Sequence, residues 1–185
     1  MQVNMLAAQH VFEKEVLYRV PLYQRPYVWN EEEQWQPLWE DIVGVAEQIM
    51  AGKPGRAHFI GATLQDHEKV LPGTIETRLL IDGQQRLTTL QLLLKAFHDL
   101  VAARGNLPYA SALEKLVRNH HPLNTEAHQD HKVWPTNADR TDFDRVMRCE
   151  DRAVLTKAYG GKADTKRVGR NIVDAYLFFF DTIGT

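Results

Sequence analysis

Cysteine is almost absent from this chain, with Cys149 as the single example among 185 residues. One cysteine excludes an internal disulfide and a zinc site built from cysteines, and we expect it to be a small core residue. Long hydrophobic runs are missing too, since the longest aromatic and apolar run, residues 176–180, is far too short to cross a bilayer. Residues 1–15 lack the basic start and apolar run of a secretory signal. These absences predict a cytoplasmic protein without membrane spans.

The chain also has little net charge. Its 22 basic and 24 acidic side chains give a formal charge of −2, which offers no general attraction to nucleic acid. Any DNA contact therefore needs a local basic patch, and basic residues do gather between Arg152 and Arg170. Within that stretch, Lys166, Arg167 and Arg170 are the candidate DNA-binding residues, and a plain solvated loop is the alternative.

Hydrophobic periodicity divides the chain into an α/β part, residues 1–105, and an all-helical part, residues 106–185. In the first part we expect strands at residues 15–20 and 58–65, a hairpin over residues 66–77, and a return strand ending at Ile81. Beyond Gly105, a natural helix end, the strand signals disappear. We expect helices at residues 111–119, 139–149 and 171–183, with Phe143, Val146 and Met147 on the buried side of the second, and a basic loop over residues 157–170. The last helix has more apolar side chains than one core-facing stripe needs, which predicts either truncation from a longer chain or a partner surface.

Three local signals refine this outline. Asn30 is expected to cap a helix, with Glu33 as its capping-box partner. Pro37 then marks either a kink in that helix or a second helix start. Gly61 is expected to let another group approach the backbone closely.

The most informative segment is residues 78–97, where a short apolar strand enters a polar turn and then an amphipathic helix. The turn reads Asp82-Gly83-Gln84-Gln85-Arg86. The first turn of a helix has unpaired N–H donors and a partial positive charge, so it attracts phosphate or carboxylate. The sequence therefore predicts an anion-binding site at this helix start.

Each residue of the turn has a functional and a structural interpretation. Arg86 offers a bidentate fork for phosphate, or a salt bridge to Asp82. Gly83 lets backbone approach a phosphate, or makes a tight turn. Gln84 and Gln85 donate to phosphate or position a water, or cap the helix. Asp82 holds Mg²⁺ through water, accepts a ribose hydroxyl or acts as a base, or caps the helix, and the Thr88 hydroxyl is an additional candidate ligand.

A second polar segment precedes the first long helix. Tyr23, Gln24 and Arg25 lie in an extended stretch between two prolines. Arg25 is expected to pair with phosphate, and the aromatic rings, Tyr27 and Trp29 included, to stack on a base. The alternative is that the rings are core and that Arg25 bridges to the acidic residues 31–33; for Trp29 we favour core packing.

Four histidines lie in the polar connection of residues 120–136, namely His120, His121, His128 and His131. No pair of them has the firm i, i+4 helical context that a metal site favours, so we expect a solvated loop and no metal site. Residues 130–135 also look like the start of an HNH nuclease motif, but no histidine follows His131. We therefore predict no nuclease site in this chain.

Several segments together resemble one family. Residues 23–29 read Tyr-Gln-Arg-Pro-Tyr-Val-Trp, residues 59–61 read Phe-Ile-Gly, and residues 81–90 read Ile-Asp-Gly-Gln-Gln-Arg-Leu-Thr-Thr-Leu. In this order they resemble the N-terminal domain of GmrSD-type, modification-dependent (Type IV) restriction endonucleases. Residues 135–143 are similar to the helical extension of that family.

The resemblance implies an α+β fold of the ParB and sulfiredoxin superfamily, a small mixed sheet flanked by helices, followed by an all-helical extension. In that superfamily a polar turn with an arginine holds nucleotide phosphates, and residues 82–86 would be the equivalent. The implied ligands are a nucleoside triphosphate and Mg²⁺. The candidate catalytic residues are Asp82, Gln85 and Arg86, and the candidate nucleotide-binding residues are Tyr23, Gln24, Arg25, Gly83, Gln84, Arg86 and Thr88.

The first functional hypothesis is a nucleotide-binding, NTP-hydrolysing sensor domain of a phage-defence protein that restricts modified DNA. The resemblance implies that cutting depends on an HNH-type nuclease domain further along the chain or on a partner subunit. One alternative is a non-catalytic DNA-recognition module for modified DNA. Another is a ParB-like clamp in which nucleotide switches the formation of a homodimer.

Overall fold

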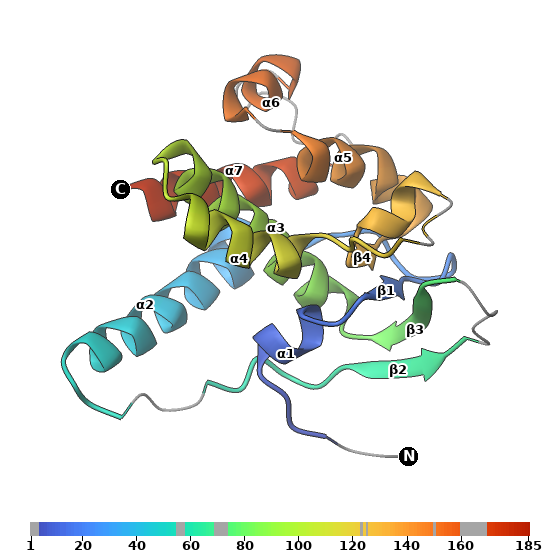
Figure 1. The fold of residues 1–185 in the computed structure, drawn as a ribbon, viewed down its shortest axis with the longest axis horizontal. Helices are drawn as coiled ribbons and strands as arrows, with labels where there is room; N and C mark the ends of the chain where they lie inside the picture. Colours follow the sequence, from blue (N-terminus) through green and yellow to red (C-terminus); the bar gives the residue numbers. More distant parts are fainter. Residues whose placement is uncertain are drawn as a thin grey trace.

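The computed structural model describes residues 4–54, 58–68, 74–122, 124, 126–149, 151–159 and 170–185. Its elements are laid out along the chain in Figure 1. They are α1 Ala8–Phe12, β1 Val16–Arg19, the π-helical turn η1 Glu31–Trp35, α2 Gln36–Met50, β2 Leu64–His67, β3 Glu76–Asp82, α3 Gln84–Ala103, α4 Leu107–Val117, the 3-10 turn η2 Ala127–Asp130, β4 Val133–Trp134, α5 Asn137–Arg148, α6 Arg152–Tyr159 and α7 Arg170–Gly184. None of the helices in the described ranges is long and apolar enough to span a membrane.

The four strands form one mixed sheet in the order β2-β3-β1-β4. β1 runs parallel to both β3 and β4, whereas β2 is antiparallel to β3. Three consecutive residues of β1, Val16, Leu17 and Tyr18, are buried, as expected for an inner strand covered on both faces. The predicted α+β class with a small mixed sheet is therefore confirmed.

The expectation that strands end before Gly105 is wrong. β4 joins the sheet beside β1, where the Tyr18 N–H donates to Lys132 O at 2.8 Å and the Val20 N–H donates to Trp134 O at 2.9 Å. A strand of two residues inside a polar connection is too short to leave an alternating pattern, so tertiary pairing alone defines it. The helix α6 also differs from the sequence expectation, which places a basic loop from Lys157 onward.

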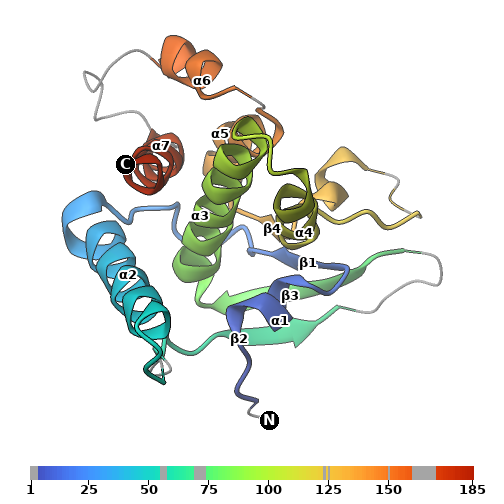
Figure 2. The same cartoon turned by 60° about the vertical axis from the view of Figure 1, so that its left-hand side comes forward.

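α3 is the central helix, and it contacts both α4 and α7 (Figure 2). A single hydrophobic cluster joins Leu80 and Leu92, from the predicted α/β part, to Phe143 and Phe179 from the predicted helical part. The parts on either side of residue 105 therefore share one core. On α5, the expected buried positions Phe143, Val146 and Met147 are all fully buried.

The apolar surplus of α7 is largely taken up within the fold. Its buried residues include Val173, Tyr176 and Phe179, and the helix contacts α3, α5 and η1. The Phe178 ring lies 5.9 Å from the Trp35 ring of η1, which covers a second side of the helix. Contacts on several sides explain why one core-facing stripe could not account for its composition.

Most local signals around the first long helix are confirmed, but the expected capping-box partner is wrong, because the Asn30 N–H donates to Gln34 Oε1 at 3.0 Å and not to the Glu33 side chain. The Asn30 side chain accepts a hydrogen bond from the Glu33 N–H at 3.0 Å, which caps η1. Pro37 lies in the first turn of α2, so it begins a second helical segment rather than interrupting one. Trp29 is half-buried and packs against the core, as favoured from the sequence.

Candidate functional site

The polar turn of residues 82–86 lies where β3 passes into α3. Gly83 is the residue before the helix and has φ +92°, a left-handed conformation that favours glycine. A Cβ at this position would lie 2.7 Å from Thr63 Cγ2 and 3.3 Å from Ala62 O. The turn thus needs glycine both for its backbone angle and for the close approach of residues 61–63.

The start of α3 presents backbone donors without helical partners. The Leu87 N–H donates to Gly83 O at 3.0 Å, so the N–H groups of Gln84, Gln85 and Arg86 precede the first helical acceptor. Among the residues that the structure describes, no side chain caps this helix through a hydrogen bond. The geometry expected of an anion-binding helix start is therefore present at this turn.

Arg86 crosses from α3 to the segment of residues 61–63. Its guanidinium donates to Ala62 O and lies 3.4 Å from Asp82 Oδ2, while a Cβ at Gly61 would lie 3.1 Å from Arg86 Nε. This confirms that Gly61 permits a close approach. The ion pair to Asp82, expected as the structural alternative, is present, but the Asp82 side chain is 70% exposed. The Arg86 side chain is 26% exposed, so the pair is open to solvent mainly on its carboxylate side.

Gln24 forms the wall opposite the turn. It belongs to the strap, our name for residues 23–29. The expectation that this whole stretch is extended is wrong at its start, where the Gln24 N–H donates to Pro21 O at 3.1 Å and closes a turn. Its Nε2 donates to Ile81 O at 3.0 Å, and its Oε1 accepts from Gln84 Nε2 at 3.3 Å. The structure thus brings one predicted residue of the strap against one predicted residue of the turn.

Tyr23 and Arg25, the neighbours of Gln24 on the strap, are exposed to solvent. The Tyr23 side chain is 77% exposed, and Arg25 is exposed as well. Within the described ranges, Arg25 has no ion pair, so the expected alternative of a bridge to residues 31–33 is not formed. Both side chains are accessible to a ligand from solvent.

Gln85 and Thr88 face inward. The Gln85 amide donates to Pro26 O at 3.0 Å and accepts from the Val28 N–H at 2.9 Å, which fastens the strap to α3. Thr88 is 3% exposed. These two predicted site residues are therefore buried beneath the turn, where they support it rather than line its open side.

Tyr27 lies at the centre of this support. Its hydroxyl is 2.7 Å from Thr89 Oγ1 and accepts from Trp35 Nε1 at 2.8 Å, and burial raises its pKa. The Tyr27 N–H donates to Asp139 Oδ2 at 2.8 Å. Burial raises the pKa of Asp139, which also accepts from the Thr136 hydroxyl at 2.8 Å. Sequence reasoning did not assign Asp139 a role, although it lies in the segment that carries the resemblance.

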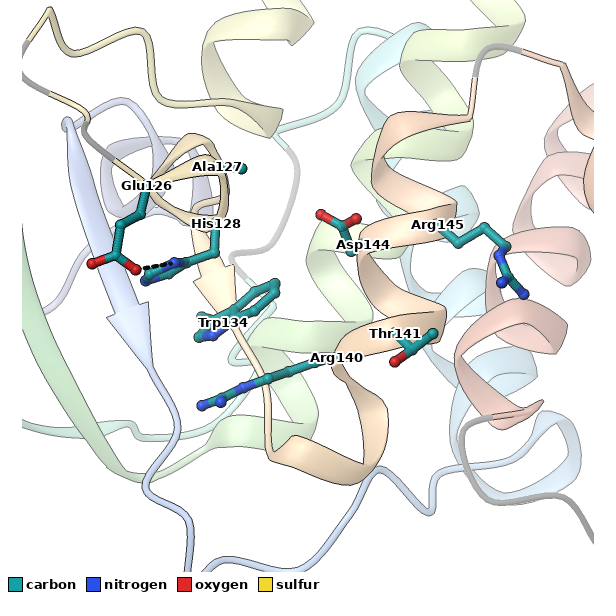
Figure 3. Close-up of a pocket in the computed structure, with 8 residues that line it drawn as sticks. All are labelled: Glu126, Ala127, His128, Trp134, Arg140, Thr141, Asp144 and Arg145. Atoms are coloured by element: carbon teal, nitrogen blue, oxygen red, sulfur yellow. Dashed lines mark ion pairs between the residues drawn. The ribbon is translucent and has the colours of Figure 1, made fainter.

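A separate cavity of about 750 Å³ is lined by residues of η2, β4 and α5. Figure 3 shows Trp134 and Arg140 on one side of it and Asp144 and Arg145 along α5. The Arg140 guanidinium lies 5.2 Å from the Trp134 ring centre, and the His128 ring stacks on the same tryptophan. This cavity contains none of the residues predicted for nucleotide binding.

The histidine-rich connection is partly structural. His131 is fully buried, its Nε2 is 2.8 Å from Asp144 Oδ1, and burial lowers its pKa, which favours a neutral ring. His128 pairs with Glu126 at 3.2 Å. In the described part of the chain, no three His, Cys, Asp or Glu side chains gather as metal ligands.

Of the predicted DNA-binding residues, Lys166 and Arg167 lie outside the described residues. Arg170 is 5% exposed, and its guanidinium donates to Tyr159 O at 2.8 Å and to the Asp174 carboxylate at 3.2 Å. In this position Arg170 is a buried link between α6 and α7 and does not face solvent as a DNA-binding arginine would.

The mixed sheet, the glycine at the start of α3 and the polar turn define a small α+β domain with unpaired backbone donors at one helix start. The family model for the GmrSD restriction endonuclease N-terminal domain matches residues 8–183. Because this match spans nearly the whole chain, the chain belongs to that family and has a role in a restriction system. No curated protein matches the chain.

Proposed function

We propose that the turn of residues 82–86 binds the phosphates of a nucleoside triphosphate, and that this domain is the nucleotide-binding sensor of a protein that restricts modified DNA. The observation that carries the proposal is the combination of the N–H groups of Gln84, Gln85 and Arg86 with the Arg86 guanidinium at one helix start. Positive partial charge and a bidentate fork in one place suit a phosphate better than a neutral ligand.

The surrounding residues suit the remaining parts of a nucleotide. The exposed Tyr23 ring offers a face on which a base can stack, and Arg25 offers a second cation for the phosphates. Gln24, already bonded to Gln84, would set the orientation of the first helical turn. Gln85 and Thr88 would act from beneath, by holding the strap and the helix in place.

Hydrolysis is the finer part of the proposal. Arg86 would stabilise charge that develops on the transferred phosphoryl group, and the exposed Asp82 carboxylate would orient the attacking water. Asp82 also fits a Mg²⁺ ion, since Mg²⁺ in such sites is held by one or two carboxylates together with phosphate oxygens. When bound, the ion would neutralise phosphate charge.

A second candidate function is recognition of modified DNA without hydrolysis. The cavity beside Trp134 favours it, because an aromatic ring and the Arg140 guanidinium above it are groups that stack on bases and pair with phosphates. In this case the turn of residues 82–86 would be structural.

Calorimetric titration of the chain with ATP, GTP, CTP and UTP in the presence of Mg²⁺ tests the first proposal. We expect binding of at least one nucleotide, and a loss of about 100-fold or more in affinity for Arg86→Ala, because two or more charged hydrogen bonds disappear. Arg86→Lys keeps the positive charge but loses the bidentate fork, so its nucleotide affinity should lie between those of the unchanged chain and Arg86→Ala. Asp82→Asn should lower the rate at which hydrolysis releases inorganic phosphate more than it lowers the affinity for the nucleotide.

Arg104→Ala is the matched control, since Arg104 lies at the other end of α3 and should leave affinity unchanged. Circular dichroism of each variant checks that it folds. Gel shifts with modified and plain duplexes separate the two functions: DNA binding that needs Trp134 but neither nucleotide nor Arg86 favours the second candidate.

A further inference from the structure

α2 differs from every long helix around it, because none of its residues is buried. In both views it extends away from the helices that pack around α3, and its far end leads only to the connection toward β2 (Figures 1 and 2). η1 holds its first turn, and Leu38 and Trp39 pack against the core. Ile42, Val43 and Val45 are half-buried, and residues 46–50 are exposed.

The exposed part of α2 is nevertheless amphipathic. At 100° per residue its apolar side chains share an arc of about 160°. They are Leu38, Trp39, Ile42, Val43, Val45, Ala46, Ile49 and Met50. A helix of a globular protein normally buries such a stripe, but here Ile49 is 60% exposed and Met50 is 87% exposed. A contiguous exposed apolar stripe is typical of an interaction surface.

All charged side chains of residues 26–52 are acidic. No lysine or arginine occurs between Arg25 and Lys53. The acidic residues of the same interval are Glu31, Glu32, Glu33, Glu40, Asp41 and Glu47. In the part of the chain that the structure describes, none of these carboxylates pairs with a lysine or arginine, and Asp41 alone has a histidine partner, His58 at 3.3 Å.

We propose that this α2 face docks a basic amphipathic helix of a protein partner. Apolar residues of such a helix would cover Ile42, Ala46 and Ile49, and its lysines and arginines would meet the acidic margin. DNA and anionic membranes do not suit the face, because its carboxylates would repel them. A second copy of α2 is equally unsuitable, since it would bring three more carboxylates, those of Glu40, Asp41 and Glu47, to the same contact.

A designed peptide provides the test. We would label a helical peptide of leucines and lysines, about five turns long, and titrate it with the 185-residue chain by fluorescence anisotropy. The comparison peptide has glutamate in place of lysine. The lysine peptide should bind and the glutamate peptide should not. Ile49→Glu combined with Met50→Glu should weaken binding about 10-fold or more, because both substitutions interrupt the apolar stripe.

Gln48→Glu is the matched control: it adds the same type of charge to the same turn but lies outside the stripe, and it should leave affinity within about 2-fold. Glu40→Lys combined with Glu47→Lys should weaken binding of the lysine peptide, because like charges then face each other. The proposal is overturned if the lysine peptide does not bind, if both peptides bind alike, or if the Ile49 and Met50 substitutions have no effect. It is also overturned by a dimer that these substitutions dissociate, or by binding to vesicles of anionic lipid. All outcomes are independent of nucleotide binding at α3.

Discussion

α3 and α2 are both long amphipathic helices, yet the fold treats them in opposite ways. Twelve of the 20 residues of α3 are buried, and they include polar residues at both ends of the helix. None of the 15 residues of α2 is buried, although its apolar stripe is wide. Periodicity predicts a helix in both cases, but neighbouring elements decide which face is covered.

The buried polar residues of α3 show what such neighbours provide. Lys95 pairs with Asp99 at 2.6 Å, and the Tyr176 hydroxyl of α7 donates to the same carboxylate at 2.8 Å. Gln85 is similarly satisfied by the strap. Buried polar groups with complete partners fix one arrangement of the surrounding elements. This frame fixes the start of α3 and the strap relative to each other, as the proposed phosphate site requires.

The largest effect should come from shortening an apolar side chain in α3. Leu92 is fully buried, so Leu92→Ala should lower the free energy of unfolding by about 2–5 kcal/mol, through lost burial and a new cavity. Ile49→Ala removes a similar side chain from α2 and should change the free energy of unfolding by less than about 0.5 kcal/mol. Urea unfolding measures both. Equal losses would show that α2 is packed in solution and would remove the contrast.

A glycine in each helical region sharpens the comparison. Gly83→Ala forces a side chain into a left-handed backbone and against Thr63, and should destabilise the chain by about 1–3 kcal/mol. A Cβ at Gly44 in α2 would meet no other described part of the chain within 4 Å, so Gly44→Ala should stabilise by about 0.5–1 kcal/mol. Thermal unfolding of both variants checks the opposite signs. A stabilising Gly83→Ala would contradict the conformation assigned to the turn.

Much of this frame is readable from the sequence. The Asn30 cap, the close approach at Gly61 and the buried face of α5 depend on local patterns, and the structure confirms them. The polar turn is also located correctly at a helix start. These features depend on a few neighbouring residues, which is why one sequence is enough to predict them.

Other features depend on distant contacts and could not be predicted. β4 exists because it pairs with β1, more than 100 residues earlier in the chain. The inward role of Gln85 depends on the extended backbone of the strap, which places Pro26 O and the Val28 N–H at the correct spacing for one amide. Gln85 is a polar residue at a helix start whether it contacts a ligand or supports the fold, so only tertiary geometry decides between the two roles.

The last expected effect is a pH dependence of stability in the body of the fold. Lys132 is fully buried, its ammonium donates to Lys14 O at 2.8 Å, and burial lowers its pKa to about 8. Above pH 8 the unfolded chain, with an ordinary lysine, binds more protons than the folded chain, so the free energy of unfolding should rise with pH by at most about 1.4 kcal/mol per unit. The rise should end near pH 10, where tyrosines with raised pKa begin to oppose it.

Urea unfolding between pH 7.5 and about pH 9.5 measures this slope. Lys132→Met should remove it, whereas Ile49→Ala in α2 should retain it, because α2 contributes no buried charge. A slope that is the same in the chain and in Lys132→Met would show that another group is responsible.

The account depends most on the claim that the start of α3 binds phosphate. An NMR titration that follows backbone amides during addition of a nucleoside triphosphate with Mg²⁺ tests it directly. The account predicts that the amides of Gln84, Gln85 and Arg86 shift most, and that the shifts disappear in Arg86→Ala but persist in Arg104→Ala. Shifts confined to the surroundings of Trp134, with the amides of α3 unchanged, would contradict it.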